Sequence, residues 1–271
     1  MTRTAISPRL AIRIFFSTGD YLAPMPIPPP NQPPGWTVKA VPETGSTNAD
    51  LLAAGAAGAP DRSVLRADHQ TAGRGRLDRT WEAPPGENLL VSFLFRDVPA
   101  DPHVLTQAVA MAALSVMRSH GVDAVMKWPN DLLVGTAKIA GVLAQAGAPG
   151  PDGRPAFVVV GIGVNIGAAP DGAASMATAG CTDLPDPGVF LAGMLPVIDD
   201  LLALDADSMH VAYRRDLATV GTAVRVEMPG GAVVNGRAVD VERDGRLVVI
   251  DDCAVTHRID TADVVHLRPA T

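Results

Sequence analysis

One loop of the sequence gathers groups that could bind an anion. The segment between Gln70 and Trp81 carries three arginines and two glycines, namely Gly73, Arg74, Gly75, Arg76 and Arg79. Glycines let the backbone approach a phosphate closely, and guanidinium groups donate planar, permanently charged hydrogen bonds to phosphate or carboxylate oxygens. The loop therefore predicts a site for an anionic ligand, with a solvated basic loop as the alternative interpretation.

A lysine at the end of an apolar strand is the second candidate. Residues 124–127 predict a short strand that ends on Lys127, followed by Trp128-Pro129-Asn130-Asp131. A residue before proline takes extended geometry and Asn-Asp favours a tight turn, so we expect the lysine to be held rigidly enough to bind a phosphate. The alternative is a strand-end lysine whose ammonium reaches solvent beside a structural turn.

Glycines also interrupt a buried run from Val158 to Gly167, which contains Asn165. Their spacing is GxGxxxG rather than the GxGxxG of dinucleotide-binding proteins, and no acidic residue ends another β run about 20 residues further on. We therefore reject a Rossmann domain. The glycines are expected to allow close packing of strands, with the Asn165 amide turned toward a pocket.

Helices and strands alternate in the part of the chain that must position these groups, which indicates an α/β or α+β fold. Strands are predicted over residues 88–95, 124–127, 139–145 and 157–162. Three helices are predicted: from a Ser46 or Thr47 cap to Gly55 with Asp50 completing a capping box, from an Asp101 cap and Pro102 to Gly121, and over residues 189–204 with a kink near Pro196.

The two ends of the chain differ in residue pattern from the central part. Prolines dominate residues 24–34, so residues 1–35 are expected to form a disordered, proline-rich tail whose short apolar run is interrupted by Arg13. After Leu217, four short β runs separated by glycine turns predict a small β-barrel. They cover residues 224–228, 237–241, 247–251 and 255–259.

Composition excludes several classes of protein. The 271 residues are 47% hydrophobic, which is ample for a core, and 22 Lys plus Arg against 29 Asp plus Glu give a net charge of −7. We therefore expect no general electrostatic binding to nucleic acid or to an anionic membrane. Because Cys181 and Cys253 form no CxxC pair, we expect no disulfide framework and no structural zinc site, which fits a cytoplasmic location.

Six motifs follow one another along the chain: Ser46-Thr47-Asn48, the loop from Gln70 to Trp81, Pro84-Pro85-Gly86-Glu87-Asn88-Leu89, residues 127–132, residues 138–141 and residues 161–165. In this order they resemble the motif set of the biotin-protein ligases, which attach biotin to carboxylase carrier domains. The resemblance covers Trp36 to about Arg268. It implies an α+β fold, in which a mixed sheet backed by helices forms a class II synthetase-like, biotin–lipoate ligase-like catalytic domain over residues 36–217. An SH3-like β-barrel would follow over residues 218–271.

The resemblance also implies roles for individual residues. Ser46, Thr47 and Asn48, with Gln70 nearby, would bind the ureido end of biotin. Arg74, Gly75 and Arg76 would belong to a loop that closes over biotin and its adenylate. Lys127 would contact the biotin carboxylate and the reacting phosphate, so Lys127 and Arg76 are the expected catalytic residues. The expected ATP or adenylate contacts are Gly73, Arg74, Arg76, Arg79, Trp81, Lys138, Gly141 and Asn165.

The implied reaction uses ATP and Mg²⁺ to convert biotin to biotinyl-5′-AMP and transfers biotin to a lysine of the biotin carboxyl carrier domain of an acyl-CoA carboxylase. Mg²⁺ is expected to bind mainly phosphates and water, so no dedicated metal ligands are expected in the chain. Only 35 residues precede Trp36, so we expect no winged-helix domain and no DNA partner. No membrane partner is expected, and a homodimer stays open.

Two departures from the family pattern bear on the site. Asp78 stands where many members have glycine, which adds a carboxylate to the closing loop, and residues 168–187 contain no aromatic side chain to cover an adenine. Two other functions stay open: a lipoate or octanoate ligase or transferase with the same architecture, and a non-catalytic biotin- or adenylate-binding sensor. The polar set Ser46, Thr47 and Gln70 favours a ureido ring over an alkyl chain.

Overall fold

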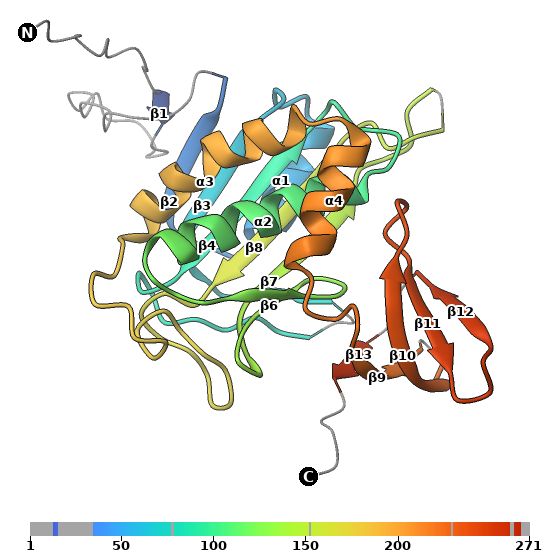
Figure 1. Cartoon of the computed structure of the whole chain (residues 1–271). Helices are drawn as coiled ribbons and strands as arrows, with labels where there is room; N and C mark the ends of the chain where they lie inside the picture. Colours follow the sequence, from blue (N-terminus) through green and yellow to red (C-terminus); the bar gives the residue numbers. More distant parts are fainter. Residues whose placement is uncertain are drawn as a thin grey trace, which may run out of the picture.

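An eight-stranded mixed sheet forms the centre of the molecule (Figure 1). The computed structural model describes residues 13–15, 35–76, 79–151, 153–228, 230–260 and 263–266. The strands are, in sheet order, β1 (Arg13–Phe15), β2 (Thr37–Thr44), β3 (Ser63–Gln70), β4 (Leu89–Phe95), β8 (Val158–Val164), β7 (Ala137–Ala146), β6 (Asp131–Val134) and β5 (Val125–Lys127). The pairs β1–β2 and β2–β3 are parallel and the remaining pairs are antiparallel.

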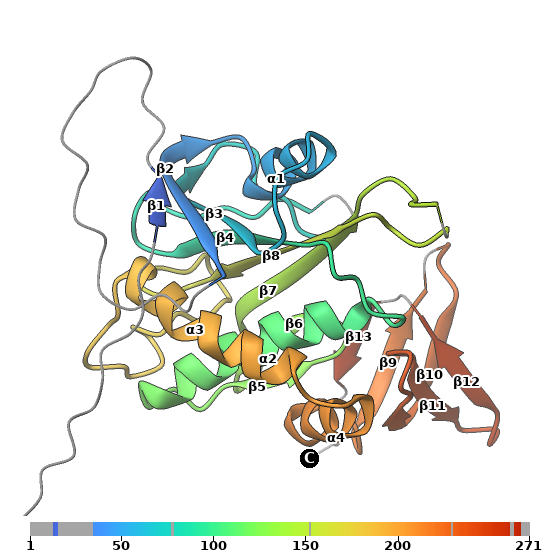
Figure 2. The same cartoon turned by 90° about the horizontal axis from the view of Figure 1, so that it is seen from above.

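Helices cover both faces of this sheet (Figure 2). Helix α1 (Thr47–Ala56) lies on one face, and α2 (His103–Ser119), α3 (Pro187–Leu202) and α4 (Ala206–Asp216) lie on the other. Strand β4 is buried at every residue because alternate side chains meet helices on opposite faces. Leu94 packs in a small cluster with Leu51 of α1, whereas Phe93 belongs to the large core under α2.

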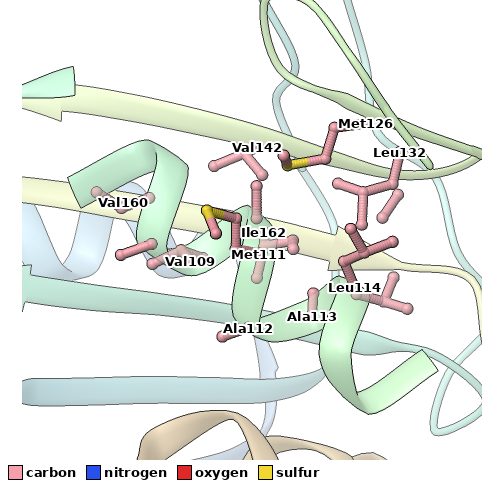
Figure 3. Close-up of a cluster of buried hydrophobic side chains, with 14 of the residues drawn as sticks. Val109, Met111, Ala112, Ala113, Leu114, Met126, Leu132, Val142, Val160 and Ile162 are labelled. Carbon is pink, nitrogen blue, oxygen red and sulfur yellow. The ribbon is translucent and has the colours of Figure 1, made fainter. Parts of the chain in front are cut away.

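The large core is aliphatic, as the composition predicts. Side chains of α2, among them Val109 and Leu114, pack against Val142, Val160 and Ile162 of the central strands (Figure 3). Several alanines of α2, including Ala112 at 0% exposure, belong to this core, where their small side chains allow close packing. Within the described part of the chain, no helix is both long and apolar enough to cross a lipid bilayer.

A second sheet follows the last helix. Its strands are β9 (Ala223–Glu227), β10 (Val233–Val241), β11 (Leu247–Asp251), β12 (Thr256–Ile259) and β13 (Asp263–His266), all antiparallel in the order β12-β11-β10-β9-β13. It is anchored to the first sheet beside β5: the Trp128 indole N–H donates to the Gly245 carbonyl at 2.9 Å, and Ala218 N donates to the Met126 carbonyl at 2.8 Å.

The three predicted helices are confirmed, but the side-chain capping bonds predicted for two of them do not form. Ser46 is the N-cap of α1 without a side-chain capping bond, and the Asp50 carboxylate accepts from the Thr44 hydroxyl instead of closing a capping box. Helix α2 begins at His103, and no side chain caps it. At α1 a tertiary contact replaces the predicted local bond, because Thr47 N donates to Gln70 Oε1 of β3. At α2 the carbonyls of Asp101 and Pro102 accept from Val104 N and Leu105 N.

Several elements were not predicted from sequence. Strands β2, β3, β6 and β13 and helix α4 are absent from the predicted elements, although Asp205 caps α4 by accepting from Asp207 N and Ser208 N, a recognisable start signal. Within the expected tail, Arg13–Phe15 pairs with Thr37–Lys39. The rest of the proline-rich segment lies outside the described residues, as does Asp78 of the basic loop.

Candidate active site

One cavity of about 440 Å³ gathers the candidate residues. It lies over the ends of β3, β5 and β8 and is bounded by the basic loop and the turn between β5 and β6. The predicted site residues that line it are Ser46, Asn48, Gln70, Arg74, Gly75, Arg76, Arg79, Trp81, Lys127, Lys138, Gly141 and Asn165. Thr47 and Gly73 do not line it; both lie directly behind lining residues.

A hydrogen-bonded group of polar side chains forms one end of the cavity. The Gln70 Oε1 atom accepts from Thr47 N at 2.8 Å and from the Thr47 hydroxyl at 2.9 Å. Through these bonds Gln70, at the end of β3, caps the N-terminus of α1. The two N–H donors of Gln70 Nε2 are left for a ligand. Asn48 donates from Nδ2 to the Leu143 carbonyl at 3.1 Å and to Gln145 Oε1 at 3.0 Å. Both amides are therefore locked in orientation before a ligand binds.

The basic loop is a narrow hairpin. Arg74 and Thr80 form a β-bridge, Gly75 N donates to the Arg79 carbonyl at 2.7 Å, and Trp81 N donates to the Gly73 carbonyl at 3.0 Å. A Cβ atom on Gly73 would lie 2.4 Å from the Trp81 carbonyl oxygen. Gly73 therefore allows the two arms of the hairpin to approach each other. This packing role explains why Gly73 does not line the cavity.

The turn after β5 holds Lys127 next to this loop. Arg76 donates to Asn130 Oδ1 at 3.1 Å, and Asn130 Nδ2 donates to the Val142 carbonyl at 2.7 Å, so Asn130 joins the loop to β7. Trp128 N donates to the buried Thr219 hydroxyl at 2.9 Å, which fixes the backbone on the other side of Lys127. Lys127 ends β5, as predicted, and one of the hydrogen bonds beside it comes from the segment that leads to the second sheet.

The other end of the cavity is built around Trp81. Its indole lies on the floor formed by β7 and β8, where a Cβ atom on Gly163 would come within 2.4 Å of Trp81 Cε2. The Lys138 ammonium lies 5.5 Å from the centre of the ring and pairs with Asp131 at 2.6 Å. The lysine is thus held beside the indole by a cation–π contact and an ion pair.

Two buried polar atoms of this end have no hydrogen-bond partner among the described residues: Trp81 Nε1 and Asn165 Oδ1. Asn165 is 2% exposed, and its Nδ2 donates to the Ala174 carbonyl at 3.0 Å, so Oδ1 is the atom left over. Buried donors and acceptors are rarely left unpaired. Both residues line the cavity, as predicted for Asn165, whereas the two atoms themselves are buried in its wall.

Several residues that line the cavity were not predicted as site residues, among them Asn130, Glu227, Gly161 and Gly163. Asn130 was interpreted only as part of a turn, and Glu227 reaches the cavity from β9 of the second sheet, which no local pattern indicates. Gly161 and Gly163 were expected to allow close packing of strands. Instead they make room for side chains, Asn48 over Gly161 and Trp81 over Gly163, and their alternation along β8 was the signal available in the sequence.

The fold and this cavity define a ligase of the biotin/lipoate type: the model of the Biotin/lipoate A/B protein ligase family matches residues 43–165. The Biotin protein ligase C terminal domain model matches residues 219–267, which correspond to the second sheet. Within this class, the chain belongs to the biotin protein ligase family. The SH3-like C-terminal part and the mixed sheet expected from the resemblance are confirmed.

Individual relatives agree with this assignment. The chain is 38% identical over 253 residues to the biotin--[acetyl-CoA-carboxylase] ligase of Mycobacterium tuberculosis, covering 86% of this chain and 91% of that protein. The biotin protein ligase from Aquifex aeolicus in complex with biotin and ATP matches with a TM-score of 0.72 at 20% identity, over 85% of this chain and 99% of that one. The Leishmania major enzyme in complex with biotinyl-5-AMP matches with a TM-score of 0.59 at 21% identity, over 86% and 100%.

Proposed function

We propose that this protein uses ATP to activate biotin as biotinyl-5′-AMP and transfers the biotinyl group to a lysine of a biotin carboxyl carrier domain of an acyl-CoA carboxylase. The observation that carries the proposal is the orientation of the two amides at the polar end of the cavity. Gln70 Oε1 is occupied by Thr47, so Gln70 offers N–H donors, whereas Asn48 has both N–H groups in use and offers an oxygen. A cyclic urea has a carbonyl acceptor and N–H donors that match both.

The same amides argue against a lipoate or octanoate ligase. An alkyl chain or a dithiolane ring would bury the Gln70 amide without an acceptor, and an unpaired buried amide costs about 1–3 kcal/mol. That penalty corresponds to about 5- to 150-fold in affinity. The polar set therefore favours biotin over an acyl substrate that lacks hydrogen-bonding groups at its far end.

Catalysis in the proposed reaction rests on positioning and charge. The biotin carboxylate attacks the α-phosphate of ATP, pyrophosphate leaves, and the carrier lysine then attacks the mixed anhydride and releases AMP. Lys127 and Arg76 would hold the two anions together against their repulsion, because both line the cavity and Arg76 is held by Asn130 of the turn that follows Lys127. Arg74 and Gly75 of the hairpin would cover the bound anhydride and exclude water.

The nucleotide would lie at the end of the cavity that contains Trp81. There the Lys138 ammonium, 5.5 Å from the centre of the Trp81 ring, would supply positive charge near the phosphates. Trp81 also supplies the aromatic surface that residues 168–187 lack. Gly141 would keep the floor flat, since a Cβ atom there would lie 2.8 Å from Lys138 Nζ and 3.3 Å from the indole.

Mg²⁺ would bind in this cavity together with the phosphates of ATP. The carboxylates that line the cavity are Glu82, Asp131 and Glu227, and the described residues contain no cluster of three or more metal-ligating side chains. This donor set fits an ion that takes one or two carboxylates and completes its octahedron with phosphate oxygens and water. Bound there, the ion would neutralise part of the charge on the phosphates.

The test is biotin-dependent exchange of labelled pyrophosphate into ATP, followed by labelling of an unmodified carrier domain. The wild-type protein should catalyse exchange with biotin and not with lipoate or octanoate, and the carrier should bind streptavidin after the reaction. Exchange supported by lipoate and not by biotin would overturn the proposal. A protein that binds biotin without any exchange would be a sensor rather than an enzyme.

A further inference from the structure

A buried serine outside the cavity wall is in contact with the biotin end. Ser92 lies in the middle of β4, a strand whose other residues are apolar, and its side chain is 0% exposed. Its Oγ lies 2.7 Å from the Thr47 hydroxyl and 2.5 Å from Asn48 Oδ1. Burying a hydroxyl costs free energy unless the group is hydrogen-bonded, so a serine at this position needs a reason.

We propose that Ser92 is a positioning residue for biotin recognition. Together with the Thr47 hydroxyl, it forms hydrogen bonds that hold the amide oxygens of Asn48 and Gln70 in place. The inference rests on the proposed function, because it concerns affinity for the urea of biotin. It goes beyond that function because Ser92 does not line the cavity and acts only through Asn48 and Thr47.

The argument is a count of protons. Thr47 and Ser92 each have one hydroxyl proton, but the row Gln70 Oε1, Thr47 Oγ1, Ser92 Oγ, Asn48 Oδ1 contains three contacts, at 2.9, 2.7 and 2.5 Å. The amide oxygens at both ends can only accept. Gln70 is oriented by the bond from Thr47 N, and Asn48 by the bond from its Nδ2 to the Leu143 carbonyl. Two protons therefore serve three contacts, and one contact always lacks a proton.

Asn48 Oδ1 has two lone pairs, and the Ser92 hydroxyl occupies one of them at 2.5 Å. Asn48 lines the cavity, so the second lone pair is left for a ligand that donates a hydrogen bond. Both N–H groups of Asn48 are bonded to Leu143 and Gln145, so the residue presents an acceptor and no donor. A urea N–H supplies the matching donor, which a lipoyl or alkyl group lacks.

Strand β8 keeps the space that this row requires. Gly161 is paired with Ser92 in the antiparallel register of β4 and β8. A Cβ atom on Gly161 would lie 2.1 Å from Asn48 Oδ1 and 3.1 Å from Ser92 Oγ, so a larger residue would push the two groups apart. The row of contacts therefore depends on residues from α1, β3, β4 and β8 at once.

The experiment measures the Kd of biotin by calorimetry for the wild type, Ser92→Ala, Thr47→Val and the double variant, with pyrophosphate exchange measured in parallel. The matched control is Ser63→Ala, which removes another buried strand hydroxyl that donates only to the Pro60 carbonyl, at 2.8 Å. Ser92→Ala should weaken biotin binding about tenfold, the effect of one hydrogen bond, and leave the KM for ATP and the Tm close to those of Ser63→Ala.

Because the two hydroxyls share their protons, the double variant should lose less affinity than the product of the two single effects, by at least about threefold. Equal changes in biotin affinity and in the KM for ATP would reveal a general structural role and overturn the inference. Unchanged biotin affinity in Ser92→Ala, or effects that multiply, would also overturn it while leaving the ligase activity intact. A wild type without biotin-dependent exchange would instead overturn the proposed function, and the inference with it.

Discussion

Two glycines two residues apart on β8 allow the two ends of the cavity to be perturbed separately. Gly161 lies under Asn48 at the proposed biotin end, and Gly163 lies under Trp81 at the proposed nucleotide end. Neither has a positive φ angle, so alanine adds only a methyl group at each position. We expect Gly161→Ala to raise the KM for biotin and Gly163→Ala to raise the KM for ATP.

The size of the effect follows from the contacts. The new methyl would lie 2.1 Å from Asn48 Oδ1 in one variant and 2.4 Å from Trp81 Cε2 in the other, and both distances are too short for a carbon atom. Asn48 cannot move without breaking its bonds to Leu143, Gln145 and Ser92. Overpacking of this kind costs about 1–3 kcal/mol, which is about 5- to 150-fold in the affected KM.

The assay is pyrophosphate exchange with one substrate varied at a time. Gly45→Ala is the matched control, because a Cβ atom there would have no described neighbour within 4 Å, although the residue is adjacent to Ser46. Each β8 variant should change the KM for its own substrate at least fivefold more than that for the other, and Gly45→Ala should change neither. If both variants raised both KM values equally, the division of the cavity into two ends would be wrong.

Three further predictions concern charge. Lys127→Ala should slow adenylation by roughly 10²-fold or more, because the lysine charge matters most when the phosphate gains negative charge. Biotin binding should weaken less. Pyrophosphate exchange at the wild-type rate by this variant would refute the catalytic role of Lys127. Arg76→Gly should still form biotinyl-5′-AMP but release it faster, because the bond to Asn130 that ties the hairpin down is lost. A streptavidin blot of an unrelated lysine-rich protein should then become positive, and an unlabelled bystander with full carrier labelling would contradict this. Burial raises the pKa of Asp216, but its hydrogen bonds and ion pairs with Arg118 and Arg215 outweigh this effect and leave the pKa below the usual range. Asp216→Asn should therefore lower the Tm at pH 7, and the difference from the wild type should shrink as the pH falls below about 4; a difference that does not depend on pH would argue against the ion pair.

Much of the site could be predicted because its chemistry is local in the chain. The arginines and glycines of the basic loop are contiguous, and Lys127 ends a strand whose apolar run and following Trp-Pro-Asn-Asp turn are both visible in the sequence. The four β runs after Leu217 are punctuated by glycine turns, and each of them corresponds to a strand of the second sheet. Patterns of this kind are informative because they depend on neighbours within a few residues.

The order of strands in the sheet decided the rest. Gln70 caps α1 although 23 residues separate it from Thr47, and Ser92 reaches Asn48 across 44 residues, because β3, β4 and β8 lie side by side. The predicted capping box at Asp50 was wrong for the same reason: a side chain from β3 satisfies the helix N-terminus. The sequence by itself determined which groups are available and, for the basic loop and Lys127, which local element carries them. Only the tertiary structure decided which amide atoms face a ligand, since hydrogen bonds between distant elements fix those orientations and no local propensity encodes them.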